Sequence, residues 1–187
     1  MLPAGPGSTM GFLVERTIFK VDVLYITVRV DEDTANGLER LVDGNSAYGR
    51  GLEDSVAALV RAAPEAVAEI RFVRDVSLEQ FLEGVDEDMA SARDAGWITP
   101  ETFDEITSGL RDWFSFLEAE GIASGDRLTY HVRGDTLRTT YRRDGAASPV
   151  LDQTDIGDQN VQALWGGYFA PGSSFRESLV RSLWEGG

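Results

Sequence analysis

The segment from residue 18 to residue 30 constrains the fold most, because it has the pattern of one long strand. β-Branched and aromatic residues dominate it, and one face collects apolar side chains at every second position: Phe19, Val21, Val23 and Tyr25. The other face begins polar at Lys20 and Asp22 and turns apolar from Leu24 onward. A strand that is apolar on both faces over half its length is expected to be covered on both sides there.

Further strands are predicted by alternating apolar and polar residues. They cover residues 68–76, then 128–133 and 137–142 in a hairpin around Gly134, and a short stretch near Val150. In the first of these strands, Ile70, Phe72 and Arg74 share one face. The stretch from residue 31 to residue 51 is polar and glycine-rich, so we expect a loop or an irregular connection there.

Capping signals mark where helices begin. Ser77 and Gln80 form a capping box, and Thr99 stands before Pro100 at a first helical position. Helices are predicted over residues 52–63, from 78 through 89, and over 100–120, 157–165 and 175–184. This order of elements favours an α+β fold, a mostly antiparallel sheet covered on one face by a layer of helices. Such an arrangement forms a cleft where apolar ligands commonly bind.

Length and the N-terminal sequence set the domain organisation. A chain of 187 residues with 42% hydrophobic content can bury one ordinary core, so residues 11–187 are expected to form a single domain. Residues 1–10 lack a basic region and an apolar region, so they do not resemble a secretory signal. We expect them to be a disordered arm or a non-native remnant, with Met10 as an alternative start. No window reaches the roughly 20 apolar residues of a membrane span, so a cytoplasmic protein without membrane insertion is expected.

Composition excludes several classes of function. The chain has no cysteine, which removes disulfides, thiolate nucleophiles and cysteine-ligated metal sites. Its single histidine, His131, is expected to be a partly exposed strand residue, and it cannot form a two-histidine metal site alone. With 32 acidic and 17 basic residues the net charge is −15, which disfavours nucleic-acid binding. No metal and no cofactor are expected.

Four blocks of sequence together carry a resemblance to a known family. They are LWGGYFAPG at residues 164–172, SFRESLV at 174–180, FKVDVLY at 19–25 and RFVRDV at 71–76. In these blocks the chain resembles the bacterial branch of the chalcone-isomerase-like family, from about residue 11 onward. The resemblance implies an open-faced sandwich of a sheet and a helix layer. The purely structural interpretation of Trp165, Tyr168 and Phe169 is that they pack the core.

The resemblance also implies site residues. The family's enzymes close a chalcone to a flavanone, and an arginine suits the enolate charge that develops because it is always charged and offers a planar fork of donors. Arg16 matches the family arginine, and the other matched positions have lost the enzymes' polar groups. Asp22 stands where the enzymes have threonine and where fatty-acid-binding relatives have tyrosine, and Phe81 stands where the enzymes have tyrosine. Asp88 replaces an asparagine, and Gly166 replaces a threonine or serine. Asp22 is expected to hold Arg16 or Lys20.

The chain retains the family arginine but lacks the enzymes' polar side chains at the other matched positions, which favours a non-catalytic binding protein. Its cleft would hold a small hydrophobic molecule with an anionic or phenolic head, a fatty acid or a flavonoid-like compound, at Arg16, Asp22, Phe81, Asp88 and Gly166. The alternative is an isomerase, an intramolecular lyase that cyclises a chalcone or a related enone with Arg16 as its catalytic residue.

A third reading is an accessory subunit that docks a partner, and a homo-oligomer is compatible with the sequence. Its docking surface would be the acidic face or residues 31–51. In the hairpin, Arg138, Arg142 and Arg143 form either a docking patch for an acidic partner or a solvated strand face.

Overall fold

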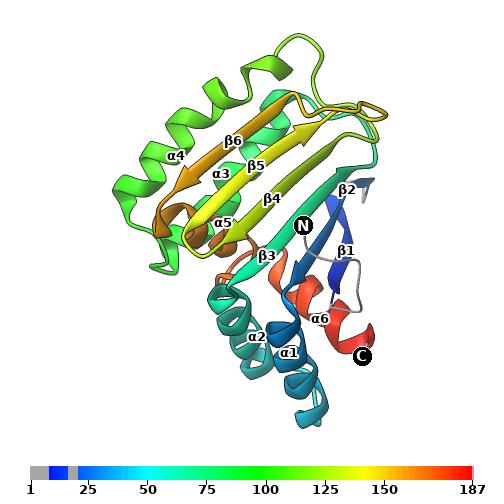
Figure 1. Cartoon of the computed structure of the whole chain (residues 1–187), viewed down its shortest axis with the longest axis vertical. Coiled ribbons are helices and arrows are strands. Elements are labelled where there is room, and N and C mark those ends of the chain that lie inside the picture. Colours follow the sequence, from blue (N-terminus) through cyan, green and yellow to red (C-terminus); the bar gives the residue numbers. More distant parts are fainter. Residues whose placement is uncertain (1–8, 17–20, 187) are drawn as a thin grey trace.

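The computed structural model describes residues 9–16 and 21–186, and this part of the chain forms one six-stranded antiparallel sheet with helices on one face (Figure 1). Each strand pairs with the next along the chain, so spatial order and sequence order are the same. The strands are β1 (Thr9–Arg16), β2 (Val21–Val30), β3 (Glu65–Phe72), β4 (Arg127–Arg133), β5 (Thr136–Arg142) and β6 (Leu151–Ile156). The expected α+β class with a mostly antiparallel sheet is confirmed.

The helices fall into two groups. They are α1 (Glu32–Gly44), α2 (Arg50–Ala62), α3 (Leu78–Asp94), α4 (Pro100–Trp113), α5 (Asp158–Phe169) and α6 (Arg176–Gly186). In Figure 1, α3 and α5 lie behind β4 to β6, and α4 runs along the outer edge of the sheet next to β6. Helices α1 and α2 extend beyond the end of β2 and β3. Helix α3 packs against α5 and α4, and α6 packs against β1 and α2. The other face of the sheet is turned toward the viewer.

The expectation of a loop over residues 31–51 is wrong, because most of this stretch is helical. Asp31 caps α1, accepting a hydrogen bond from the backbone N–H of Thr34 at 3.1 Å. Ala35 and Leu38 are buried on the inner side of the helix. The few apolar residues of α1 therefore fall on one stripe, and tertiary packing of that stripe outweighs the glycine and asparagine content.

At the N-terminal end, Thr9 and Met10 belong to β1, so part of the expected arm at residues 1–10 is strand. Residues 1–8 and 17–20 lie outside the described part of the chain. On β2, Leu24 and the residues two and four positions later face the helices, whereas Tyr25 on the opposite face is 40% exposed. The expected cover on both sides is therefore wrong at Tyr25, because in this one-sided layered fold the helices pack on a single face.

The capping signals located their helices correctly. The Ser77 hydroxyl accepts from the backbone N–H of Gln80, and the Gln80 side chain accepts from the backbone N–H of Ser77, which completes the predicted capping box of α3. Thr99 caps α4 as predicted. Helix α4 ends at Trp113 rather than near residue 120, and a short 3-10 turn, Ser115–Leu117, follows it. That turn places Leu117 in the core with no exposed surface.

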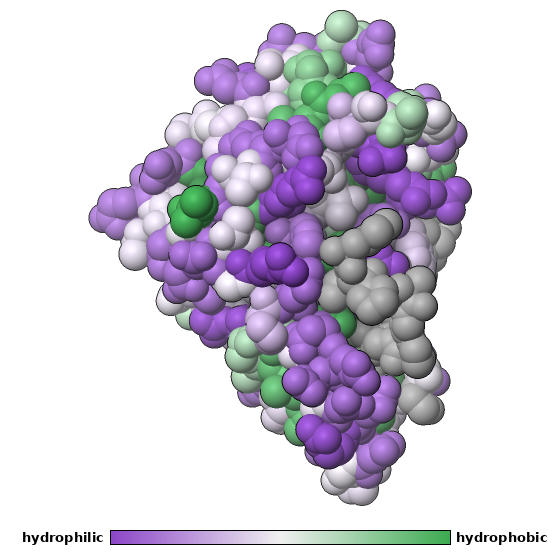
Figure 2. All heavy atoms as spheres, in the orientation of Figure 1, coloured by the Kyte–Doolittle hydropathy of each residue, from purple (hydrophilic) through white to green (hydrophobic). Residues whose placement is uncertain are grey.

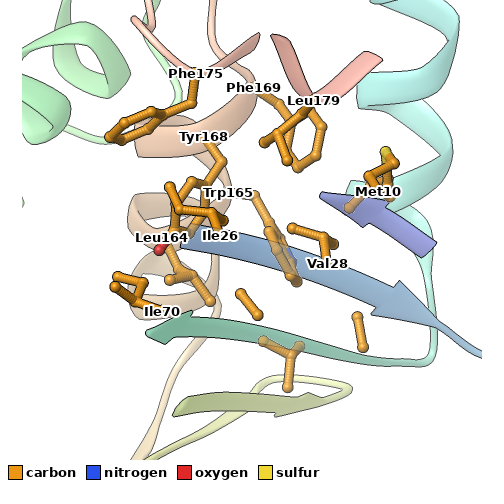
Figure 3. Packing of buried hydrophobic residues seen from close by; sticks show 14 of the residues in the cluster. Met10, Ile26, Val28, Ile70, Leu164, Trp165, Tyr168, Phe169, Phe175 and Leu179 are labelled. Carbon is orange, nitrogen blue, oxygen red and sulfur yellow. The ribbon is translucent and has the colours of Figure 1, made fainter. Parts of the chain in front are cut away.

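The main core lies between the sheet and helices α5 and α6. Figure 3 shows Trp165 and Phe169 of α5 and Leu179 of α6 directed at Ile26 and Val28 of β2 and at Met10 of β1. Trp165 and Phe169 have no exposed surface and Tyr168 has 5%, as expected for core residues. Aromatic side chains of this size dominate the burial of apolar surface, so the sequence block at residues 164–172 fixes α5 on the sheet.

Candidate functional site

A cavity of about 400 Å³, called the main cavity below, lies between the helix-facing side of the sheet and helices α3 and α5. Its wall is mostly apolar, and Figure 3 shows part of it where Ile26, Ile70, Leu164, Tyr168 and Phe175 converge from β2, β3, α5 and the segment before α6. The remaining apolar lining includes Leu24, Phe72, Val76, Phe81, Val85 and Met89. A mostly apolar, concave space with a few polar groups is typical of small-molecule sites.

A smaller hollow of about 80 Å³ adjoins the main cavity and extends toward β5, β6 and α4. The two spaces share four wall residues: Val85, Met89, Tyr130 and Leu164. The far wall of the hollow is lined by apolar side chains that include Leu110, Leu137 and Leu151. The adjoining hollow therefore offers a longer ligand a path past Met89 and Tyr130, between α3 and β4.

Two adjacent glycines of α5 let it approach α3 closely. A Cβ atom at Gly166 would lie 2.3 Å from the Cβ of Ala92, and one at Gly167 would lie 3.0 Å from the Cε of Met89. Gly167 lines the main cavity, whereas Gly166 packs against α3 and does not line it. The candidate ligand-binding role of Gly166 is thus not supported by its position. Its requirement for glycine comes from helix packing.

Phe81 lines the main cavity, as the resemblance implied for this position. Its ring makes edge-to-face contacts with Phe72, with centroids 6.1 Å apart, and with Phe114, with centroids 5.0 Å apart. The site gains an apolar wall here and no hydroxyl group. Aromatic contacts of this geometry stabilise the wall by roughly 0.5–1.5 kcal/mol each beyond burial.

Asp88 also lines the main cavity, together with two phenols that sequence reasoning did not assign to the site, Tyr130 and Tyr168. Burial raises the pKa of Tyr130 far above its usual range, and the charge of Asp88 raises it further. Burial likewise raises the pKa of Tyr168, with added repulsion from Tyr130 and Asp88. Both phenols are therefore neutral in the physiological pH range and keep a proton that they can donate.

Arg74 supplies a positive charge to the main cavity wall. Its Nε atom is buried, and no hydrogen-bond partner for it exists among the described residues. A buried donor left without an acceptor costs about 1–3 kcal/mol, and more when the group is charged. The alternation that places Arg74 on one face with Ile70 and Phe72 was visible in the sequence, and it identifies this arginine as facing the helices.

The side chains of Arg16 and Asp22 lie outside the described part of the chain. Their backbones are placed at one end of the β1–β2 pair, where Arg16 pairs with Val21 and Asp22 with Glu15. Leu24, two positions after Asp22 on β2, reaches the main cavity. A contact of Arg16 or Asp22 with a ligand, and the ion pair between them, stay predictions.

The main cavity also has acidic residues in its lining, and these limit what it can bind. Glu83, Glu87 and Asp88 of α3 contribute carboxylates, against the single guanidinium of Arg74 among the described lining residues. Glu83 and Glu87 are exposed to solvent, whereas Asp88 is half-buried. Within residues 9–16 and 21–186, no cluster of carboxylates and histidine is arranged to hold a metal ion, and no helix is long and apolar enough to span a membrane.

No protein-family model matches the chain, and no curated protein sequence matches it. Among solved structures, the chain is similar to a fatty-acid binding protein of Arabidopsis thaliana, with a TM-score of 0.59. The two are 15% identical, and the similarity covers 97% of this chain and 92% of the plant protein. The fold is chalcone-isomerase-like. At this level of identity the comparison establishes the fold that the resemblance implied, and membership of the family's bacterial branch stays a prediction.

Proposed function

We propose that this protein binds a small amphipathic molecule, with an apolar body in the main cavity and an anionic or phenolic head at Arg74. The observation that carries the proposal is a buried guanidinium nitrogen, the Nε of Arg74, which has no hydrogen-bond partner among the described residues and lies on the wall of a mostly apolar cavity of about 400 Å³. An oxygen acceptor on a ligand would satisfy that nitrogen, and the apolar lining would bury the remainder of the molecule.

The carboxylates in the lining determine how such a ligand is oriented. An anionic head beside Asp88 would meet a like charge in a poorly solvated space, so it is excluded from that side of the cavity. A head at Arg74 instead gains a charge-assisted hydrogen bond. The ligand therefore extends away from Arg74, with its apolar part against Phe81, Met89 and Leu164.

The ligand class favoured by the comparison is a fatty acid, because the similar plant protein is a fatty-acid binding protein. The smaller hollow behind Met89 and Tyr130 fits the same class, since a flexible chain can enter a narrow extension that a rigid flavonoid cannot. We infer that long-chain fatty acids bind more tightly than short-chain ones.

Isothermal titration calorimetry with delipidated full-length protein and a series of saturated fatty acids tests the proposal. We expect saturable binding, and we expect Arg74→Gln to weaken it at least about tenfold, as for loss of a hydrogen bond to a charged group. Arg111→Gln is the matched control, because Arg111 lies on the surface of α4 and pairs with Glu79. Its affinity should stay within about twofold of the wild type.

Fatty alcohols of equal length separate the head-group contact from burial of the chain. They lack the negative charge, so Arg74→Gln should weaken their binding much less than it weakens binding of the acids. Absence of binding to every fatty acid and flavonoid tried would refute the proposal. Equal losses in Arg74→Gln and Arg111→Gln would refute the role of Arg74.

The two neutral phenols support a second candidate, the isomerase. Tyr130 and Tyr168 place hydroxyl donors in the same cavity as Arg74, and such donors can stabilise an enolate oxygen. Stopped-flow absorbance with a chalcone would show turnover faster than buffer, reduced about 100-fold in Tyr130→Phe if that phenol contacts the enolate. Reaction at the uncatalysed rate would eliminate this candidate and leave ligand binding unaffected.

A further inference from the structure

The open face of the sheet, turned away from the main cavity, carries an arrangement of arginines that ligand binding in the cavity does not use. In Figure 2 this face is covered mainly by hydrophilic residues, shown in purple. The register of β3, β4 and β5 brings Arg71 opposite Arg127, and Arg127 opposite Arg142. All three side chains are exposed. We call these three residues the arginine row.

The arginine row places like charges on directly opposed positions of neighbouring strands. Opposed Cβ atoms in an antiparallel pair lie about 5 Å apart, and like charges placed there destabilise the sheet. Arg127 takes part in two such pairs because it occupies the middle strand. The fold thus tolerates an unfavourable arrangement at one end of this face.

Other arginines of the same region have acidic partners. Arg138 donates two hydrogen bonds of 2.7 Å to Asp152, and Arg143 donates one of 2.8 Å to Asp126. By contrast, no ion pair within the described ranges includes Arg71, Arg127 or Arg142. Acidic residues outnumber basic ones 32 to 17 in this chain, so the lack of carboxylate partners at three adjacent arginines is unexpected.

A polar hollow of about 350 Å³ adjoins the row. Arg127 and Arg142 line it, and Thr129 and Thr140 add two hydroxyl groups from the same strands. Its negative groups are Glu69 on β3 and Asp144 in the loop after β5. Arg143, which also lines the hollow, is held by Asp126 and by the carbonyl oxygen of Gly121 at 2.7 Å. The rim of the hollow is thereby fixed in place.

We propose that the arginine row and this hollow form a binding site for a phosphate-bearing small molecule, such as a phosphate monoester or a diphosphate. Adjacent strands of a sheet lie about 4.8 Å apart. Guanidinium groups on such strands can each direct two N–H donors at the oxygens of one phosphate or of two linked phosphates. Thr129 and Thr140 donate to the remaining oxygens. The site is independent of the main cavity, because alternate residues of the same strands face opposite sides.

Titration of the ¹⁵N-labelled full chain with inorganic pyrophosphate at constant ionic strength tests the site by NMR. We expect saturable shifts of the side-chain Nε–H signals of Arg71, Arg127 and Arg142. Arg127→Gln removes the central charge and should weaken binding at least about tenfold. Arg138→Gln is the matched control on the same face and should bind within about twofold of the wild type, because Arg138 is already engaged by Asp152.

A second arm distinguishes a soluble phosphate compound from a phospholipid head group. Glycerol phosphate is titrated in solution, and sedimentation is measured with phosphatidylcholine vesicles that contain phosphatidic acid. Saturable binding in either arm that is lost in Arg127→Gln supports the site and identifies the source of the phosphate. Shifts that rise linearly with pyrophosphate, or equal losses in Arg127→Gln and Arg138→Gln, would overturn the proposal, because they indicate a diffuse charge effect.

Discussion

Arg176 and Arg74 both have buried nitrogen atoms, and they differ in what surrounds those atoms. Arg176 of α6 donates to Glu53 at 3.3 Å, to the carbonyl oxygen of Phe169 at 3.1 Å and to Asp54. Its side chain is only 7% exposed. The Nε of Arg74 is also buried, yet it has no partner among the described residues. Arg176 therefore links α6, α2 and the end of α5, whereas the Nε of Arg74 makes no such link within the described residues.

This contrast separates structural arginines from those available to a ligand. A buried charge is tolerated when acceptors from the chain surround it, and removing it leaves those acceptors unpaired. A buried donor without an acceptor destabilises the fold, and that cost is relieved when a ligand supplies the acceptor. Arg176 should therefore matter for stability, and Arg74 for affinity.

The largest effect is expected for Arg176→Met, which removes the buried guanidinium that contacts Glu53 and Asp54. We expect the free energy of unfolding to fall by about 3 kcal/mol, measured by urea denaturation. Fatty-acid affinity of the folded variant should stay within about twofold. Arg181→Met on the same helix is the control, because Arg181 forms an exposed pair with Glu177 and should change stability by less than about 1 kcal/mol. A loss of less than about 1 kcal/mol for Arg176→Met would contradict the structural role of Arg176.

Lowering the pH tests an arginine that has an acidic partner, because protonation of Asp126 weakens its ion pair with Arg143. Asp126 is 1% exposed, and burial alone would raise its pKa. Its carboxylate accepts hydrogen bonds from Tyr141, from Arg143 and from the backbone N–H groups of Ala123 and Asp144. These hydrogen bonds outweigh burial and lower the pKa of Asp126. The stability that the carboxylate contributes is therefore complete above the unfolded pKa of about 4 and is lost as the pH falls toward the lower folded pKa.

For Asp126→Asn we expect a loss of about 2 kcal/mol at pH 7, less than for Arg176 because Arg143 is 22% exposed and can regain water. Urea unfolding between pH 7 and pH 3 should show a smaller decline in the variant than in the wild type. Parallel curves for the two proteins would contradict the assignment of the acid effect to Asp126.

Arg74→Met should have the opposite pattern from Arg176→Met. The free energy of unfolding should stay the same or rise by up to about 1 kcal/mol, because a buried Nε–H that has no acceptor among the described residues is replaced by an apolar chain. Fatty-acid affinity should fall at least about tenfold. A stability loss of about 2 kcal/mol or more would show that Arg74 has a structural function.

The smallest effect is expected for Trp165→Phe, which tests whether a partnerless donor alone marks a ligand site. The Nε1 of Trp165 is buried without a partner in the described residues, but Trp165 does not line the main cavity. The smaller ring leaves a cavity, which destabilises the fold, while removal of the unpaired N–H stabilises it. We therefore expect the free energy of unfolding to fall by about 1 kcal/mol. Fatty-acid affinity should change less than about twofold, and a tenfold change would extend the site to this side chain.

Local signals in the sequence predicted much of the fold. The capping box at Ser77, the cap at Thr99 and the hairpin turn at Gly134, where φ is +58°, depend on residues close in sequence. Helix α1 was missed because its glycines and asparagine lower helix propensity, and its stability comes from packing against α2, which a local pattern does not reveal.

The candidate site was predicted only in part. Phe81 and Asp88 line the main cavity, in keeping with the resemblance, while Gly166 is used for helix packing. Arg74 and Tyr130 were missed as site residues although their alternation placed them with apolar neighbours. Strands β2, β3 and β4 are far apart in the sequence and converge on the cavity, so the set of polar groups that meet there depends on strand register and helix packing.

Gly167 sets the capacity of the main cavity through backbone proximity rather than through side-chain bulk. A methyl group at this position would meet the Cε of Met89 at 3.0 Å and the Cβ of Asp88 at 3.4 Å. Met89 is flexible and lines both the main cavity and the adjoining hollow, so its displacement would change the shape of both spaces. A single substitution at position 167 would therefore reshape the main cavity while the sheet, the helix caps and Arg74 stay unchanged.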